Sequence, residues 1–184
     1  LRGGAGDDIN YGGAGNDFMG GDTSGHDHYG GDEGVDRVSL YNGFTGVTVD
    51  LTVTGQQDTG VGLDTFVDIE DITATYFNDT LTGNESANWF WVFGGNDTLF
   101  GNGGDDLFSI GAGDKVIDGG DGSDTVEMYD DFAGYGPEGV TMSLELQGSW
   151  QWTGLGSLYL TNVENLAGYW GDDHLTGDVQ ANIL

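Results

Sequence analysis

Cysteine is absent from this sequence, so it can form neither a disulfide framework nor a thiolate metal site. Proline occurs once among 184 residues, which excludes collagen and proline-rich linkers. The basic residues are only Arg2, Arg37 and Lys115. Nucleic acids and anionic membrane surfaces are therefore poor partners, because almost nothing in the chain could neutralise their phosphates.

Targeting segments are missing as well. The sequence has no signal peptide and no apolar run of the roughly 18 residues that would suggest a transmembrane helix. Both ends of the sequence fall within glycine-rich repeats. We therefore expect it to be a fragment of a longer protein, so the missing export signal carries little weight.

Catalytic motifs are not found either. The sequence contains no HExxH zinc motif, no GxSxG nucleophile motif and no GxxxxGK[ST] phosphate loop. With three basic residues and three histidines, few side chains could assist an acid in general acid–base catalysis. We expect that this chain is not an enzyme.

Glycine and aspartate dominate what is present. The 37 glycines carry a heavy entropic cost unless the backbone must turn tightly at regular intervals. The 32 acidic residues comprise 25 Asp and seven Glu, and they leave a net charge of −29. Such self-repulsion disfavours a compact state until cations bind, and the short Asp side chain suits a cation held by its own turn.

A nine-residue register runs through most of the chain. Between residues 74 and 127, the in-phase positions are Asp79, Asn88, Asp97, Asp106, Lys115 and Asp124. Two residues after each lies an apolar partner, predicted to point inward from a short strand: Leu81, Phe90, Leu99, Phe108, Ile117 and Val126. An earlier run contains Asp8, Asp17, Asp27 and Asp36. A later run begins at Asp173, with Leu175 two residues on, and continues nine residues later at Asn182, with Leu184 as its apolar partner.

Two segments, residues 39–77 and 128–171, interrupt this register and resemble each other. VTVDL at 47–51 corresponds to VTMSL at 140–144, and VDIEDI at 67–72 corresponds to NVENLA at 162–167. The alternation in GVTVDLTV and in MSLELQ predicts half-buried strands. We interpret both segments as wider rungs of the same solenoid.

The turns have the chemistry of a calcium site. In GGAGND at 12–17, glycines permit positive φ and let several carbonyl oxygens face one point, where the final Asp adds a carboxylate. Roughly six to eight such hard oxygens suit Ca²⁺ better than Mg²⁺. Successive turns must alternate between two sides of a flattened coil. Same-side turns about 18 residues apart would therefore clamp about four ions, between Asp8 and Asp27, Asp17 and Asp36, Asp79 and Asp97, and Asp106 and Asp124.

The segment GGAGNDFMG at 12–20 resembles the repeats-in-toxin (RTX) motif GGxGxDxUx, where U is a large apolar residue. The resemblance covers about 105 residues in three runs. It implies an all-β fold, a parallel β-roll or β-solenoid of the hemolysin type with two wider interrupting rungs. It also implies calcium-dependent folding, type I secretion from a Gram-negative bacterium and a place in a larger secreted or cell-surface protein, but no single activity.

We divide the chain into a first calcium-binding run at 1–38, wider rungs at 39–77, a second run at 78–127, wider rungs at 128–171 and a truncated third run at 172–184. The candidate metal ligands are the turn-ending carboxylates Asp8, Asp17, Asp27, Asp36, Asp79, Asp97, Asp106, Asp124 and Asp173. The turn residues that accompany them are Gly3, Ala5, Gly6, Gly12, Ala14, Gly15, Gly21, Gly25, Gly31, Gly34, Gly94, Gly95, Gly101, Gly103, Gly104, Gly119, Asp121 and Gly122.

Two turns depart from the motif. GNESAN at 83–88 ends in Asn88, which makes a calcium site there doubtful, and IGAGDK at 110–115 ends in Lys115. We expect the Lys115 ammonium to enter the oxygen-rich gap and replace the ion. The alternative is that Lys115 turns into solvent and that Asp114 or a water completes a distorted site.

Aromatic residues gather where the repeats become irregular. Trp89 and Trp91 flank inward-pointing Phe90 and are predicted to face outward; the others are Trp150, Trp152, Tyr169 and Trp170. If exposed, they would favour an adhesin, surface-layer or carbohydrate-binding module that contacts polysaccharide or copies of itself. If buried, they would be covers over the wider rungs.

Two histidines, His26 and His28, flank Asp27 and could hold a transition metal, although surface histidines are the simpler interpretation.

The function that we favour is a calcium-triggered folding and export module. Its charges would keep it unfolded in the low-calcium cytosol, and calcium would fold it outside the cell.

Overall fold

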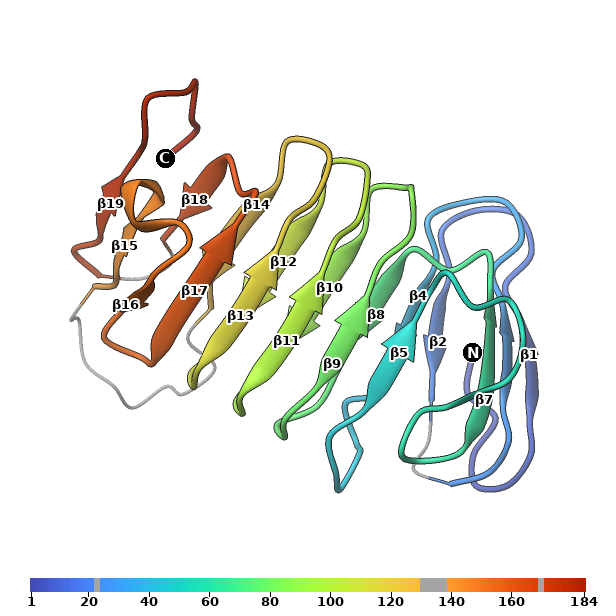
Figure 1. Ribbon diagram of the computed structural model, residues 1–184. Helices are drawn as coiled ribbons and strands as arrows, with labels where there is room; N and C mark the ends of the chain where they lie inside the picture. The colour runs from blue at the N-terminus through green and yellow to red at the C-terminus, as the bar shows by residue number, and fades with distance from the viewer. Residues whose placement is uncertain (22–23, 130–138, 169–170) are drawn as a thin grey trace.

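The computed structural model describes residues 1–21, 24–129, 139–168 and 171–184. Short strands lie side by side along one axis, from the N-terminal end to the C-terminal end (Figure 1). The described part of the chain contains no helix that is long and apolar enough to cross a membrane.

The strands of the described residues form four sheets. At the N-terminal end, four strands follow the order β1 (Ile9–Tyr11), β3 (His28–Gly30), β7 (Leu63–Val67) and β6 (Gln57–Asp58). A seven-stranded sheet has the order β2 (Phe18–Gly20), β4 (Arg37–Ser39), β8 (Asp71–Thr73), β10 (Trp89–Val92), β12 (Leu107–Ile110), β14 (Thr125–Met128) and β18 (Asn165–Ala167).

The six-stranded sheet follows the order β5 (Thr48–Asp50), β9 (Thr80–Thr82), β11 (Asp97–Phe100), β13 (Lys115–Asp118), β17 (Ser157–Thr161) and β16 (Trp150–Trp152). A two-stranded sheet pairs β15 (Thr141–Ser143) with β19 (His174–Thr176), and a 3₁₀ helix, η1 (Leu144–Leu146), follows β15. The chain is therefore an all-β parallel roll, as the sequence predicts.

Strand pairing confirms the 18-residue spacing between same-side turns. Leu99 of β11 pairs with Leu81 of β9 on one side and with Ile117 of β13 on the other, and all three strands are parallel. The named strand pairs are parallel except β6 with β7 and β16 with β17, which are antiparallel. Each coil of the chain thus places one strand in each of two neighbouring sheets.

The core is a stack of the predicted inward side chains. Leu81, Leu99, Phe108, Ile117 and Val126 are completely buried, and Phe90 is nearly so. The two residues that flank each of them in a strand point away from the core, which is the period-two pattern of a strand buried on one face. The exception is Leu184, predicted as an inward residue, which lies exposed where the described chain ends.

Both interruptions continue the roll as wider rungs. β8 lies between β4 and β10, while β17 pairs with β13 and β18 pairs with β14. The strands predicted for GVTVDLTV and MSLELQ are shorter than expected, because η1 replaces the second half of MSLELQ and a turn follows Asp50. The Asp50 carboxylate accepts hydrogen bonds from the Thr52 backbone N–H and hydroxyl, which bends the chain away from the sheet.

Glycine is required where turns of successive rungs meet. Gly113 has φ of +109°, and a Cβ on it would lie 2.0 Å from the carbonyl oxygen of Gly95 in the neighbouring turn. No other residue could occupy that position without moving the two turns apart. The glycine content therefore sets the close spacing of the turns.

We predict that Ile117→Ala destabilises the folded protein by about 2–5 kcal/mol, because it leaves a cavity in the fully buried stack. Ile9→Ala is the matched control, since Ile9 is also a strand residue but is 71% exposed. Urea unfolding of both variants at saturating calcium measures the difference. Equal midpoints for the two would contradict the inward register.

Candidate metal-binding site

A repeated hydrogen bond joins the turn-ending residues of neighbouring same-side turns. In each of the four predicted pairs, the backbone N–H of the first Asp donates to Oδ1 of the second: Asp8 to Asp27 at 2.9 Å, and Asp17 to Asp36, Asp79 to Asp97 and Asp106 to Asp124 at 2.8 Å. The structure thus brings each pair together. We call the space between two such turns a gap and name it by the two turn-ending residues.

The second carboxylate oxygen has a different environment from Oδ1. The Oδ2 atoms of Asp8, Asp36, Asp106 and Asp124 are buried and have no hydrogen-bond partner among the described residues. A buried carboxylate oxygen without a partner is costly, so native structures normally satisfy it with a donor or a cation. These oxygens are therefore candidate ligands of a cation.

Carbonyl oxygens lie in the same gaps. A Cβ on Gly101 would lie 2.1 Å from Asp106 Oδ2 and 2.2 Å from the Gly119 carbonyl oxygen. A Cβ on Gly122 would lie 1.9 Å from the Gly104 carbonyl oxygen of the preceding turn. The absence of side chains at these glycines therefore leaves room in the Asp106/Asp124 gap, and oxygen atoms surround that room.

The same arrangement recurs in the first run. Gly12 faces Asp17 Oδ2 and the Gly31 carbonyl oxygen, at 2.9 and 3.0 Å from its Cβ position. Gly25 and Gly34 each face a carbonyl oxygen of the preceding turn, from Gly6 and Gly15 respectively, at 2.3 Å. The first-run turns thus repeat the contacts of the second run.

Electrostatics also favour a cation. Burial, together with the nearby charges of Asp124 and Asp105, raises the pKa of Asp106 to about 7 despite the lowering effect of the hydrogen bond from the Asn88 N–H. Burial likewise raises the pKa of Asp124 to about 6, with Glu164 adding to the effect. A divalent ion would offset the cost of burying these carboxylates and the smaller repulsion between them, which together raise their pKa values.

The oxygen set fits calcium. Within the described ranges, no three His, Asp or Glu side chains cluster as a metal-ligand group, so any ion in a gap would depend largely on backbone carbonyls. Carboxylate and carbonyl oxygens are the ligands of hard cations, and a large flexible shell suits Ca²⁺. The turn-ending Asp residues and the carbonyls of the turn glycines would hold it.

The Asp79/Asp97 gap differs from the other three. Asp79 Oδ1 accepts hydrogen bonds from the Val47 N–H and the Thr75 hydroxyl, and Asp79 Oδ2 accepts one from the Thr75 N–H. Both oxygens of the first carboxylate therefore already have partners. The predicted pairing is present, but its first carboxylate has no oxygen that lacks a partner.

Lys115 occupies the next gap in that row, as predicted. Its side chain is almost completely buried. The ammonium lies 3.1 Å from Asp97 Oδ2 and donates hydrogen bonds to the carbonyl oxygens of Gly95 and Ala112 at 2.7 and 2.8 Å. Burial lowers the pKa of Lys115, whereas the charge of Asp97 raises it. The alternative in which Lys115 turns into solvent is wrong. The contacts of this ammonium show where a cation sits between two turns.

Asn88 also forms a gap without a carboxylate pair. Its N–H donates to Asp106 Oδ1 at 2.7 Å, as an Asp would, while its side-chain amide donates to the Glu70 carbonyl oxygen at 2.8 Å. A neutral amide donor therefore takes the place of a cation between the Glu70 and Asn88 turns.

Asp173, the last predicted ligand, accepts a hydrogen bond from the Val140 N–H at 2.9 Å.

Three carboxylates that the nine-residue register does not predict also accept hydrogen bonds from turn-ending residues. Asp27 N–H donates to Asp64 Oδ1, Asp36 N–H to Glu70 Oε2 and Asp124 N–H to Glu164 Oε2, at 2.9, 2.8 and 2.9 Å. The series of N–H to carboxylate bonds between same-side turns, which we call the ladder, therefore continues into the wider rungs. The likeness between DIEDI at 68–72 and NVENL at 162–166 was the available signal, because Glu70 and Glu164 are each the third residue of these segments.

The histidines give no support to a transition-metal site. His26 Nδ1 accepts a hydrogen bond from the Leu63 N–H at 3.1 Å, and the His28 ring packs edge-on against Tyr11. These contacts give both rings structural partners in the N-terminal sheet.

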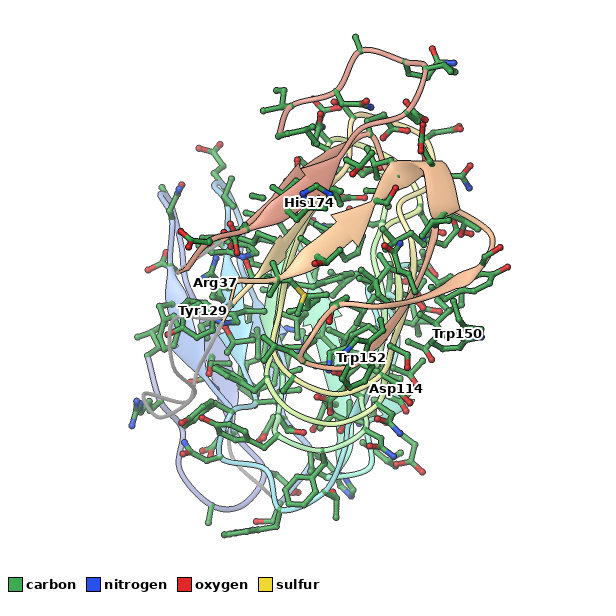
Figure 2. The ribbon with its side chains drawn as sticks, turned by 90° about the vertical axis from the view of Figure 1, so that its left-hand side faces the viewer. Arg37, Asp114, Tyr129, Trp150, Trp152 and His174 are labelled. Carbon is green, nitrogen blue, oxygen red and sulfur yellow. The ribbon has the colours of Figure 1, made fainter. Side chains whose placement is uncertain are left out.

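The aromatic residues divide into two groups. Trp89 and Trp91 do point away from the core, but their rings stack on each other at 5.8 Å, and the Arg37 guanidinium lies 4.0 Å from the Trp89 ring centroid. Trp150 and Trp152 on β16 are 56% and 68% exposed; Figure 2, which views the C-terminal end, shows Trp150 near the right-hand edge of the molecule and Trp152 further in. Tyr169 and Trp170 lie outside the described residues.

Comparison with known families agrees with the geometry. A family model described as the RTX calcium-binding nonapeptide repeat (four copies) matches residues 1–19, 73–108 and 111–127. These ranges contain both regular runs of turns in part, including the Lys115 turn. A search of curated proteins finds no significant match.

We predict that Lys115→Asp adds one bound calcium ion per chain, because it restores the second carboxylate opposite Asp97 where the ammonium now lies. Lys115→Met is the control, which removes the ammonium without adding a ligand. Isothermal titration calorimetry of both variants and the parent counts the ions. An unchanged count in Lys115→Asp would contradict the replacement of an ion by the ammonium.

Proposed function

We propose that the chain, whose regular runs match the RTX calcium-binding nonapeptide-repeat family model, is a structural module of a secreted protein that folds when it meets calcium outside the cell. The proposal rests on the buried Oδ2 atoms that have no hydrogen-bond partner among the residues that the structure describes: those of Asp8, Asp36, Asp106 and Asp124. The protein must neutralise these oxygens before its turns can close.

The charge of the chain makes calcium a directional switch. With a net charge of −29 and three basic residues, the chain repels itself when no cation is present. Extracellular calcium modules bind at about 10⁻⁴–10⁻³ M, well above the sensor range of about 10⁻⁷–10⁻⁵ M. The module would therefore stay unfolded during export and fold on arrival, and it would serve the larger protein rather than catalyse a reaction.

We predict that the parent chain is largely disordered in excess chelator and gains β structure cooperatively as calcium is added, because the ions cancel charge that otherwise opposes closure of the turns. Far-ultraviolet circular dichroism during a calcium titration measures this change. Magnesium at equal concentration is the control and should not substitute. A complete β signal in excess chelator would contradict the proposal.

The same titration can test a single ligand. Asp106→Asn should raise the calcium midpoint severalfold, because Asp106 Oδ2 faces the Asp106/Asp124 gap. Asp105→Asn is the matched control, since Asp105 is the exposed neighbour and the charge change is identical. Equal midpoints for these two variants would place the ions elsewhere.

A second candidate function rests on Trp150 and Trp152, which alternate with the buried Gln151 on β16 at the edge of the six-stranded sheet. The ring of Tyr159 lies 5.5 Å from that of Trp150 and extends the aromatic surface. Exposed indoles held on a rigid strand can stack on the apolar faces of sugar rings. The module could thus also bind a polysaccharide of the cell surface.

For this second function, we expect Trp152→Ala to reduce binding to an insoluble polysaccharide at least severalfold without changing the calcium midpoint of folding. Trp89→Ala, at the packed pair, is the control and should leave polysaccharide binding unchanged. Pull-down on chitin, cellulose and peptidoglycan measures it. Failure of the folded parent to bind any of the three would remove this candidate.

A further inference from the structure

The two wider rungs place a glutamate at the end of a run of calcium-type turns. Glu70 follows Asp36 and Glu164 follows Asp124 in the ladder, and each accepts the backbone N–H of that Asp at 2.8 and 2.9 Å. This is the bond that joins the Asp pairs. On the basis of the proposed calcium function, we infer that Glu70 and Glu164 complete two further calcium sites, in the Asp36/Glu70 and Asp124/Glu164 gaps.

The unsatisfied oxygens face these gaps. A Cβ on Gly31 would lie 1.9 Å from the Asp68 carbonyl oxygen and 2.4 Å from Asp36 Oδ2. A Cβ on Gly119 would lie 2.0 Å from the Asn162 carbonyl oxygen and 2.5 Å from Asp124 Oδ2. Asp36 and Asp124 are both completely buried, and neither Oδ2 has a hydrogen-bond partner in the described part of the chain.

The backbone of both rungs is shaped to present a carbonyl there. Asp68 and Asn162 both have φ of +50°, a left-handed conformation that is uncommon outside glycine and that Asp and Asn tolerate best. In a regular turn, the carbonyl oxygen of the first glycine of the next turn lies at this place, as the Gly119 carbonyl oxygen does beside Gly101. In the wider rungs, the carbonyl oxygens of Asp68 and Asn162 lie there instead. The same strained conformation therefore recurs in two segments at the same position relative to a partnerless carboxylate.

A glutamate suits this place because the connection is short. Only Ile69 separates Asp68 from Glu70, and only Val163 separates Asn162 from Glu164, whereas a regular turn is six residues long. The regular turn brings an Asp close to the preceding carboxylate. In the shortened turn, the additional methylene of Glu extends the carboxylate to the preceding Asp N–H, as the two hydrogen bonds show.

Lys115 supplies an internal comparison for the position of the charge. Its ammonium contacts Oδ2 of the preceding turn-ending Asp and the carbonyl oxygen of Gly95, the fourth residue of that turn. The corresponding atoms of the new gaps are Asp36 Oδ2 with the Gly34 carbonyl and Asp124 Oδ2 with the Gly122 carbonyl. No lysine reaches either set within the described residues, and Arg37 pairs instead with Asp71 at 2.9 Å.

Glu70→Gln and Glu164→Gln should each reduce the number of calcium ions bound per chain by one, and the double variant by two. Gln keeps an oxygen that can accept the Asp N–H, so the rung should still fold. Glu33→Gln is the matched control, because Glu33 is exposed in the turn that ends at Asp36 and loses the same charge. Native mass spectrometry of calcium-loaded chains gives the counts.

The outcomes separate this inference from the function on which it rests. A parent that binds no calcium would refute both, whereas a loaded parent with unchanged counts in the two Gln variants would refute only the Glu sites. Glu70→Lys adds an independent test. It should remove one ion but retain the β signal, since its ammonium can neutralise Asp36 as Lys115 neutralises Asp97. A retained ion in Glu70→Lys would overturn the assignment.

Discussion

The structure depends on bringing carboxylates together in buried gaps. At Asp36 and Asp124, a hydrogen bond from the preceding turn fixes one carboxylate oxygen, and the other oxygen stays buried without a hydrogen-bond partner among the described residues. The apolar stack that forms the core lies directly between these rows of turns, so the strands cannot pair without drawing the charges together. Burial of the core and neutralisation of the turns are consequently one event.

The chain shows three ways of satisfying a gap. Lys115 provides a built-in ammonium, Asn88 provides a neutral amide donor, and the regular turns leave a partnerless oxygen suited to calcium. The first two need no ion. They occur in neighbouring rungs near the middle of the roll, where the core residues are fully buried. This central region can therefore close with less calcium than the turns on either side of it.

Much of the fold could be predicted from the sequence because the repeated Asp and the apolar residue two positions after it each have one structural role. The Asp ends a turn, and the apolar residue points into the core. The inward position of Ile117, the pairing of Asp106 with Asp124 and the burial of Lys115 all follow from the nine-residue register. The ligands in the wider rungs were harder to predict from the sequence, because the shortened turns there do not follow the nine-residue spacing. Glu70 and Glu164 join the ladder through backbone geometry at Asp68 and Asn162, which the register does not encode.

The most direct test of this account is to locate the ions by anomalous X-ray scattering from crystals grown with calcium. The account predicts peaks in the Asp17/Asp36 and Asp106/Asp124 gaps, next to the glycine carbonyls, and none beside the Lys115 ammonium. Peaks confined to exposed carboxylates, or a peak between Asp97 and Lys115, would contradict it.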